Sequence, residues 1–270
     1  MKTNVKGCIM IVLSGIRRNI NMKITFVGSG HGVPSAQRYC SAVMVEVGAS
    51  IYFIDAGAPI MDELLRMGRD INNVRAVFIT HCHGDHLSGL PNMADLADWY
   101  YKDAKIGFYL PEQSTIDAIE ALIVSTHGGR PLREGVDFYQ YDEGFVYQDE
   151  NIKLTAIPNK HIFTQNRPSY CFLVEADGKR VLFSGDLSQH LALEDFPKLA
   201  MSEELDAFVC EMAHFTIDML KPYLRKCTAK AVYFNHVYPL DKFNHIEAED
   251  ASGEYPFKMH IAKDRDEILL

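Results

Sequence analysis

The chain has 270 residues, of which 47% are hydrophobic and 23% charged, and its formal net charge is −9 at pH 7. This length suits one large domain or two small ones, and the composition is that of a globular protein, which excludes collagen, coiled coil and extensive disorder. The negative balance argues against a protein that holds nucleic acid through a basic face. The negative charge is compatible with a site for metal cations, although most acidic proteins are simply soluble proteins without such a site.

Residues 1–21 precede the first clear strand. They contain a short apolar run, Cys8 to Leu13, between basic residues. The run is too short to cross a bilayer and lacks the long apolar core and small-residue cleavage site of a signal peptide. We therefore treat 1–21 as an extension of undefined role, with Met22 as a candidate start, and 22–270 as a single domain.

The first predicted strands are apolar and β-branched and end at Gly or Asp. They are Lys23–Val27, Ala42–Val47, Ile51–Ile54, Val74–Ile79 and Ile106–Leu110. Apolar residues at helical spacing predict helices over Pro59–Met67, which stops at Gly68, and over Leu87–Tyr101. In the second helix these positions are Leu90, Met93, Leu96 and Trp99. Aromatic side chains at such spacing, with Tyr100 and Tyr101 beside them, are expected in the core rather than in a substrate groove.

The second half continues the same mixture. A helix is predicted over Ser114–Thr126 and another over Thr216–Leu224. Tyr170–Glu175 and Arg180–Phe183 form a hairpin around the turn Ala176-Asp177-Gly178. The other predicted strands are Val136–Tyr141, Ile152–Ile157, Leu205–Cys210, Ala231–Phe234, Lys258–Ile261 and Glu267–Leu270. Many strands with helices between them predict an α/β (α+β) fold of two sheets sandwiched by helices.

The six cysteines are scattered and form no CxxC pair: Cys8, Cys40, Cys82, Cys171, Cys210 and Cys227. In a chain of this length such spacing is not a disulfide framework. Cys171 and Cys210 lie in apolar runs and are expected to pack as small core residues. The expected compartment is the reducing cytoplasm.

The segment His81-Cys82-His83-Gly84-Asp85-His86 follows a buried strand and holds four side chains that bind metals. Alternate residues of extended chain point the same way, so His81 and His83 can grip one cation together. Gly84 permits a turn, after which Asp85 and His86 face a second cation. Imidazole and carboxylate groups suit zinc, manganese or iron. Cys82, between the two ligands, is expected to face away and to pack.

Two cations need more ligands than these four, including a bridging group. His161, Asp186 and His236 each follow a predicted strand. Taken singly, a histidine or aspartate after a strand is more often a turn residue than a metal ligand. Together they lie at the same ends of successive strands, where open sheets place their sites.

With these residues in view, the sequence resembles the metallo-β-lactamase-fold hydrolase superfamily, whose HxHxDH signature matches His81 to His86. The resemblance covers about Met22 to Leu270 and implies an αββα sandwich with two mixed sheets. It implies that the first metal is held by His81, His83 and His161. The second metal is then held by Asp85, His86 and His236, and Asp186 bridges the two.

Within the superfamily the chain is most similar to the tRNase Z-like branch. The segments that carry this likeness are Val27–Pro34, Ile54–Gly57, Ser169–Phe172 and Glu211–His214. His214 is similar in placement to the proton-donating histidine of that branch. It is either this donor, with Glu211 as its partner, or a helix-start histidine without a catalytic role. The chain departs from the branch in one respect: between Asp98 and Asn159 we find no long Gly/Pro-rich arm of the kind that grips tRNA.

Metal binding lowers the pKa of bound water toward about 7, so hydroxide is available to attack a phosphorus or carbonyl centre. Asp85 is expected to orient this nucleophile while it binds metal. Asp55 is either an orienting partner of a ligand histidine or a plain turn residue. His31, after the Gly-rich turn, either approaches the site or is solvated, and a solvated loop histidine is the more common case.

We therefore predict a dinuclear metal-dependent hydrolase with two divalent ions, foremost zinc, with manganese or iron as alternatives. The favoured activity is phosphodiesterase-type, on a small nucleotide or RNA end. The alternatives are a carboxylic-ester, lactone or thioester hydrolase and, more remotely, a di-iron redox or binding protein. The expected partners are a small-molecule or short nucleic-acid substrate and no membrane, and a homodimer is the assembly to test.

Overall fold

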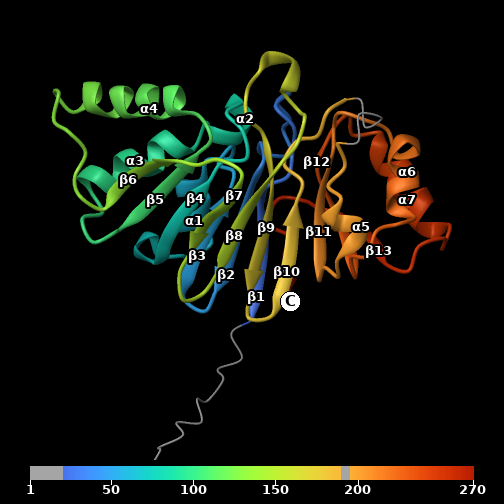
Figure 1. The fold of residues 1–270 in the computed structure, drawn as a ribbon. Coiled ribbons are helices and arrows are strands. Elements are labelled where there is room, and N and C mark those ends of the chain that lie inside the picture. Colours follow the sequence, from blue (N-terminus) through green and yellow to red (C-terminus); the bar gives the residue numbers. More distant parts are fainter. Residues whose placement is uncertain (1–20, 190–194) are drawn as a thin grey trace, which may run out of the picture.

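The structure is a computed structural model that describes residues 21–189 and 195–270. The extension predicted over 1–21 lies, apart from its last residue, outside the described residues. Two seven-stranded sheets pack face to face with helices on both outer sides, as Figure 1 shows. The predicted αββα sandwich is thus confirmed. No helix of the described ranges combines the length and apolar character that a membrane crossing requires.

The first sheet has the strand order β14-β1-β2-β3-β4-β5-β6. Its strands are β1 (Met22–Gly28), β2 (Ala42–Val47), β3 (Ser50–Ile54), β4 (Val74–Phe78), β5 (Ile106–Leu110), β6 (Val136–Gln140) and β14 (Glu267–Leu269). The pairs from β3 to β6 are parallel. The carboxyl ends of these strands therefore meet at one edge, which is where the His81–His86 segment follows β4.

The second sheet has the order β13-β12-β11-β10-β9-β8-β7. Its strands are β7 (Gly144–Gln148), β8 (Lys153–Pro158), β9 (Tyr170–Ala176), β10 (Lys179–Phe183), β11 (Ala207–Met212), β12 (Ala231–Val237) and β13 (Lys258–Ile261). The hairpin β9–β10 turns at Asp177 and Gly178, both at positive φ, as a two-residue hairpin turn requires. Strand β7 was not predicted.

Helices α1 (Ile60–Arg66), α2 (Gly84–Leu87), α3 (Leu90–Trp99) and α4 (Gln113–Thr126) follow strands of the first sheet. Helices α5 (Leu199–Ser202), α6 (Ile217–Leu224) and α7 (Lys242–Ala251) belong to the second half. Two short 3₁₀ turns, η1 (Ile71–Asn73) and η2 (Phe163–Gln165), complete the described elements. Helix α7 was not predicted.

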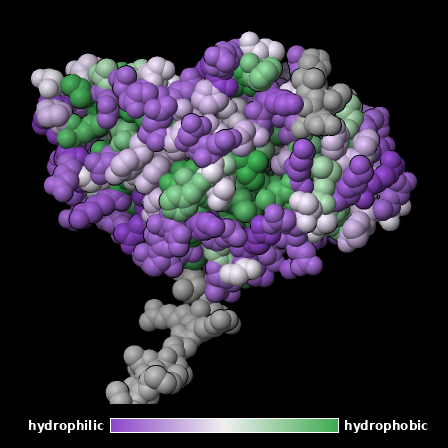
Figure 2. Space-filling view, in the orientation of Figure 1, coloured by the Kyte–Doolittle hydropathy of each residue, from purple (hydrophilic) through white to green (hydrophobic). Residues whose placement is uncertain are grey.

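Burial on both faces of the sheets follows from this layering. On β9, Phe172 and Val174 pack between the sheets, whereas Cys171 and Leu173 pack toward the outer helices. Side chains alternate along a strand, so a strand covered on both sides is apolar at nearly every position. Where the second sheet is less covered, its outer face shows an apolar area surrounded by hydrophilic residues (Figure 2).

Three sequence predictions need correction. The helix expected over Leu87–Tyr101 is broken, because α2 ends at Leu87 and α3 begins at Leu90. At the break the Gly89 N–H donates to Ala56 O at 2.7 Å, and a Cβ on Gly89 would lie 2.0 Å from Ala58 O. No local sequence pattern predicts this close approach of Gly89 to the backbone of Ala56 and Ala58.

Two of the three aromatic residues at the end of this helix are also not in the core, whereas Tyr101 packs against it. Trp99 is 44% exposed and Tyr100 is 62% exposed. The buried positions of α3 are instead occupied by Leu90, Met93 and small residues such as Ala94 and Ala97. The helix lies so close to the sheet that small side chains fit this face and the larger rings fall beyond it.

His236 does not follow its strand but lies within β12, at a φ of +54°. Glu211 pairs with Asn235 and Met212 with Val237, so His236 is an extra residue between two ladder positions. A bulge of this kind re-aims one side chain. Here the bulged side chain is the one that the sequence analysis assigned to the metal site.

Candidate metal centre

The seven predicted ligands converge at one edge of the sandwich. His81 and His83 follow β4, Asp85 and His86 lie in the first turn of α2, and His161 follows β8. Asp186 follows β10, and His236 is the bulged residue of β12. The site is therefore assembled from the strand ends of both sheets, which brings together residues as far apart as 81 and 236.

His81, His83 and His161 form the first group, with one ring nitrogen of each within 4.8 Å of the others. His83 Nδ1 lies 3.1 Å from His81 Nε2 and 3.2 Å from His161 Nε2. Burial lowers the pKa of all three rings, most strongly that of His81. They are therefore neutral near pH 7, which is the form of imidazole that binds metals.

Asp85, His86 and His236 form the second group. Asp85 Oδ2 lies 3.2 Å from His236 Nε2 and 3.7 Å from His86 Nε2. Burial opposes ionisation of Asp85, but the hydrogen bond from His236 and the charge of His86 hold the pKa of this carboxyl well below its usual range. A charged carboxylate and two imidazoles thus face a common point.

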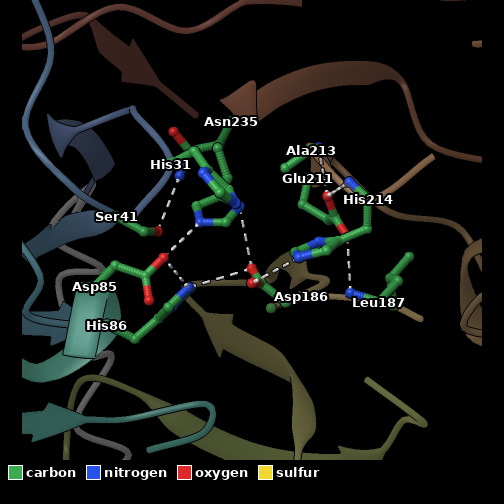
Figure 3. A network of polar contacts seen from close by, with 12 residues as sticks. His31, Ser41, Asp85, His86, Asp186, Leu187, Glu211, Ala213, His214 and Asn235 are labelled. Atoms are coloured by element: carbon green, nitrogen blue, oxygen red, sulfur yellow. Dashed lines mark hydrogen bonds and ion pairs between the residues drawn. The ribbon is translucent and has the colours of Figure 1, made fainter. Parts of the chain in front are cut away.

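Asp186 lies between the two groups, with one oxygen toward each. Figure 3 shows it between His86 and His214. Its Oδ1 is 3.3 Å from His86 Nε2 and 3.3 Å from His236 Nδ1. Its Oδ2 is 3.8 Å from His81 Nε2 and 3.7 Å from His161 Nε2. A carboxylate so placed can bind a cation in each group at once.

The residues present fit bound cations. Within the described residues, His86 Nε2, His236 Nδ1 and Asp186 Oδ1 are buried and have no hydrogen-bond partner. Buried polar atoms are nearly always paired, so three orphans at one point call for a ligand. The donor set of imidazole nitrogens and carboxylate oxygens suits zinc, manganese or iron.

Asp55 orients a histidine of the second group. It follows β3 at a φ of +60° and is buried. Its Oδ2 accepts a hydrogen bond from His86 Nδ1 at 2.7 Å, and its Oδ1 accepts one from the Thr80 N–H at 2.8 Å. The ring of His86 is thereby left with Nε2 toward the centre. Of the two interpretations of Asp55, the structure supports the orienting partner.

Two glycines let the backbone approach Asp85. A Cβ on Gly57 would lie 1.6 Å from the Asp85 carbonyl oxygen, and one on Gly32 would lie 2.7 Å from Asp85 Oδ2. Gly32 belongs to the Gly-rich turn after β1, and Gly57 to the turn after β3. Both positions are occupied by glycine because a side chain at either one would push α2 away from the centre.

Glu211 and His214 border the same centre. Glu211 Oε1 accepts hydrogen bonds from His214 Nδ1 at 2.8 Å and from the Leu187 N–H at 2.9 Å. Burial works against protonation of His214, but the charge of Glu211 and this hydrogen bond raise its pKa to about 9. His214 Nε2 lies 3.9 Å from Asp186 Oδ2, so the protonated ring faces the centre.

Of the two cases left open for His31, the structure shows the less common one, because the residue approaches the site. Its half-buried ring lies 4.9 Å from that of His236 and 5.8 Å from that of His214, measured between centroids. The only signal in the sequence was its position directly after the Gly-rich turn. Cys82, by contrast, packs against the helical side of the first sheet as expected, and burial raises the pKa of its thiol to about 12.

The stretch where a tRNA-gripping arm was sought is described throughout. Between Asp98 and Asn159 the chain forms β5, α4, β6, β7 and β8 in close succession. No long excursion leaves the body of the protein there, as Figure 1 shows.

Comparisons with known proteins agree with this geometry. A ribonuclease Z of Methanocaldococcus jannaschii is 25% identical over 228 residues, which cover 83% of this chain and 69% of that protein. A ribonuclease Z of Geobacillus kaustophilus is 31% identical over 161 residues, or 58% of this chain and 50% of the relative. The chain thus spans about half the length of the bacterial relative.

Solved structures of low sequence identity share the fold. The metallo-β-lactamase fold protein YhfI of Bacillus subtilis superposes with a TM-score of 0.72 at 15% identity, covering 93% of this chain and 100% of that one. The short form of human tRNase Z superposes with a TM-score of 0.66 at 19% identity, covering 91% and 98%.

A family model described as the anti-Pycsar protein Apyc1 matches residues 22–255. The match begins at the first strand and takes in all seven residues of the two metal-competent groups and the bridge. The chain therefore belongs to the family of the anti-Pycsar protein Apyc1 and has the metallo-β-lactamase fold in its tRNase Z-like form.

Proposed function

We propose that this protein is a dinuclear metal-dependent phosphodiesterase that acts on a small nucleotide or a short RNA end. The observation that carries the proposal is the position of Asp186, which turns one oxygen to each of two groups of metal-competent side chains. A site that only stabilises a fold is usually closed and rich in cysteine, whereas this one is built from histidine and aspartate.

His81, His83 and His161 would hold one cation, and Asp85, His86 and His236 the other, with Asp186 shared. Two such cations, when bound, supply an activated water and offset the negative charge that develops on the reacting phosphate. We propose zinc for both positions, with manganese and iron as alternatives.

The protein's own contribution is to position the reacting groups and to move one proton. Asp85, which Gly32 and Gly57 approach closely, orients the attacking oxygen. His214, held by Glu211 through Nδ1, presents Nε2 to the centre and donates a proton to the departing oxygen. Asp85 lies in α2, and His214 follows β11. If the first orients the attacking oxygen and the second protonates the departing one, the substrate binds between them.

Two features support a small substrate. The stretch between Asp98 and Asn159 carries no arm, and the net charge of −9 offers no general attraction to a long polyanion. The relatives named ribonuclease Z support a phosphodiester linkage as the bond that is cleaved.

The test is metal content of the purified protein together with turnover of bis(p-nitrophenyl) phosphate and of a p-nitrophenyl carboxylic ester. About two zinc or manganese ions per chain with cleavage of the diester support the proposal. Cleavage of the carboxylic ester alone would replace it with an esterase or lactonase. Two iron ions that undergo redox changes without hydrolysis would replace it with the di-iron alternative.

A cytoplasmic location and a homodimeric assembly stay predictions. Cell fractionation tests the first of these. Size-exclusion chromatography with light scattering tests the second.

A further inference from the structure

His31 lies at the centre without belonging to any of its metal-competent groups. In the described residues, the five groups whose ligand atoms lie within 4.8 Å of one another do not include it. Its ring nevertheless contacts the ring of His236 and lies beside that of His214. Figure 3 shows His31 beside Asn235, the residue that precedes His236 in the chain. It therefore lies next to both the second group of ligands and the proton donor.

The hydrogen bonding of this ring defines its tautomer. The Val33 N–H donates to His31 Nδ1 at 3.1 Å. A backbone amide can only donate, so Nδ1 is the unprotonated nitrogen and the neutral ring carries its hydrogen on Nε2. No partner for Nε2 is found among the described residues, which leaves a free N–H donor at the rim of the site.

The ring is also held in place from the outside. Tyr238, which is 38% exposed, stacks on His31 with 4.8 Å between centroids and 15° between planes. The loop that carries His31 is tied down at both ends by Asp264, which accepts hydrogen bonds from the N–H groups of Ser29 and Tyr39 at 2.9 and 2.7 Å. A donor on such a restrained loop loses little freedom when it binds a ligand.

We propose that His31 is a substrate-binding residue whose Nε2–H donates a hydrogen bond to a phosphoryl oxygen of the substrate, with Tyr238 as the support that orients its ring. This inference rests on the proposed function, since it assumes an anionic phosphate at the centre. It adds to the site a neutral donor that stands beside the metal ligands and outside their coordination.

The experiment compares His31→Ala, His31→Gln and Tyr238→Ala with wild type in the metal-loaded protein. The matched control is His260→Ala, because His260 stacks on Tyr233 in the same way, with centroids 4.9 Å apart at 18°, at an exposed position of β13 outside the centre. The measurements are kcat and KM with bis(p-nitrophenyl) phosphate, metal content, melting temperature, and calorimetric binding of inorganic phosphate.

Loss of one hydrogen bond to a charged group predicts that His31→Ala lowers kcat/KM by about 10- to 100-fold. Phosphate binding is expected to weaken by about 10-fold or more, with metal content and melting temperature unchanged. His31→Gln, which keeps an N–H donor, restores part of both. Tyr238→Ala shows a smaller loss than His31→Ala, and His260→Ala matches wild type.

A change of less than about twofold in both kcat/KM and phosphate binding would overturn the inference, as would a loss of metal from His31→Ala. A wild-type protein that loads metal but leaves the diester intact would refute the proposed function instead. Phosphate binding by wild type and His31→Ala then decides the role of His31 by itself: weaker binding supports it, and equal binding overturns it.

Discussion

Glu211 holds His214 by a hydrogen bond of 2.8 Å between Oε1 and Nδ1, and by doing so decides which nitrogen of the imidazole faces Asp186. A carboxylate only accepts here, so Nδ1 carries a hydrogen and Nε2 is the nitrogen turned to the centre. The same carboxylate oxygen accepts the N–H of Leu187, whose carbonyl in turn accepts from His161 Nδ1 at 3.1 Å. One buried side chain thus couples the proposed proton donor to a proposed ligand.

His214→Ala should slow phosphodiesters with poor leaving groups far more than those with good ones. Removal of a general acid costs about 100-fold or more when the leaving oxygen needs a proton, and much less for p-nitrophenolate. Steady-state rates with phenyl and p-nitrophenyl diesters measure this. Glu211→Gln should show the same trend more weakly, and Glu254→Gln, at an exposed ion pair with Arg225, should show none. An equal loss with both substrates would remove His214 from proton transfer.

Asp186→Ala should reduce bound metal from about two ions per chain to one or none, because each group loses the carboxylate oxygen that is turned to it. The fold should persist, since its core between the sheets is apolar and does not include this residue. Metal analysis and circular dichroism of the same preparation test both statements. In wild type, chelation should lower the melting temperature and added metal should restore it, because a ligand of the native state stabilises that state. Full metal content in Asp186→Ala would exclude the bridge.

Asp55→Asn should weaken metal binding by roughly 10- to 100-fold, the usual effect of removing a partner that orients a ligand histidine. The amide cannot offer the second acceptor oxygen that His86 Nδ1 and the Thr80 N–H use together. Competition with a chelating dye measures the affinity. Asp62→Asn, on the exposed side of α1, serves as the control. Unchanged affinity in Asp55→Asn would make Asp55 a plain turn residue.

Lys242→Met should lower diester turnover without removing metal. The Lys242 ammonium donates to the carbonyl oxygens of Met212, Ala213 and Phe215 at 3.1, 2.7 and 2.7 Å, and these residues flank His214. Loss of the ammonium frees three carbonyls and loosens this loop, so we expect about a 10-fold decrease in turnover, comparable to the cost of one or two hydrogen bonds. Lys226→Met, at an exposed position, is the control. Wild-type turnover in Lys242→Met would show that the loop holds its shape by itself.

Asp149→Asn should destabilise the protein near neutral pH and cease to matter in acid. Asp149 lies at the end of the sandwich opposite the centre, where Oδ2 accepts hydrogen bonds from Tyr52 and Tyr147 at 2.5 and 2.9 Å. Burial opposes its ionisation, but the Tyr52 hydroxyl and nearby donors lower its pKa.

The direction of this pH dependence follows from the lowered pKa of Asp149. A depressed pKa in the folded state adds stability above the unfolded value of about 3.9, and this stability is lost as pH falls through the folded pKa. Thermal melts should therefore show a gap of roughly 2–8 °C between wild type and Asp149→Asn at pH 7 that closes below about pH 4. A gap that persists in acid would mean that charge on Asp149 plays no part.

The metal-competent groups show which parts of the site can be predicted from local sequence. Four of their members lie within six residues, so the spacing of histidine and aspartate in the sequence is enough to predict them. His161, Asp186 and His236 were predictable because each lies at or near the end of an apolar strand, although the bulge that aims His236 was not. The bulge depends on how β12 pairs with β11, and a strand's own residues do not encode its partner's register.

By itself, the sequence determined every described strand except β7, the two-sheet sandwich and the set of metal-competent residues, because apolar alternation and clustered ligands are local patterns. Only the tertiary structure decided that His31 reaches the centre, that Trp99 and Tyr100 stay outside the core, and that α2 and α3 are separate helices. The first and the last of these depend on a contact between segments distant in sequence: His31 with His236, and Gly89 with the backbone of Ala56 and Ala58. Such contacts arise when the sheets pack, and no periodicity along the chain records them.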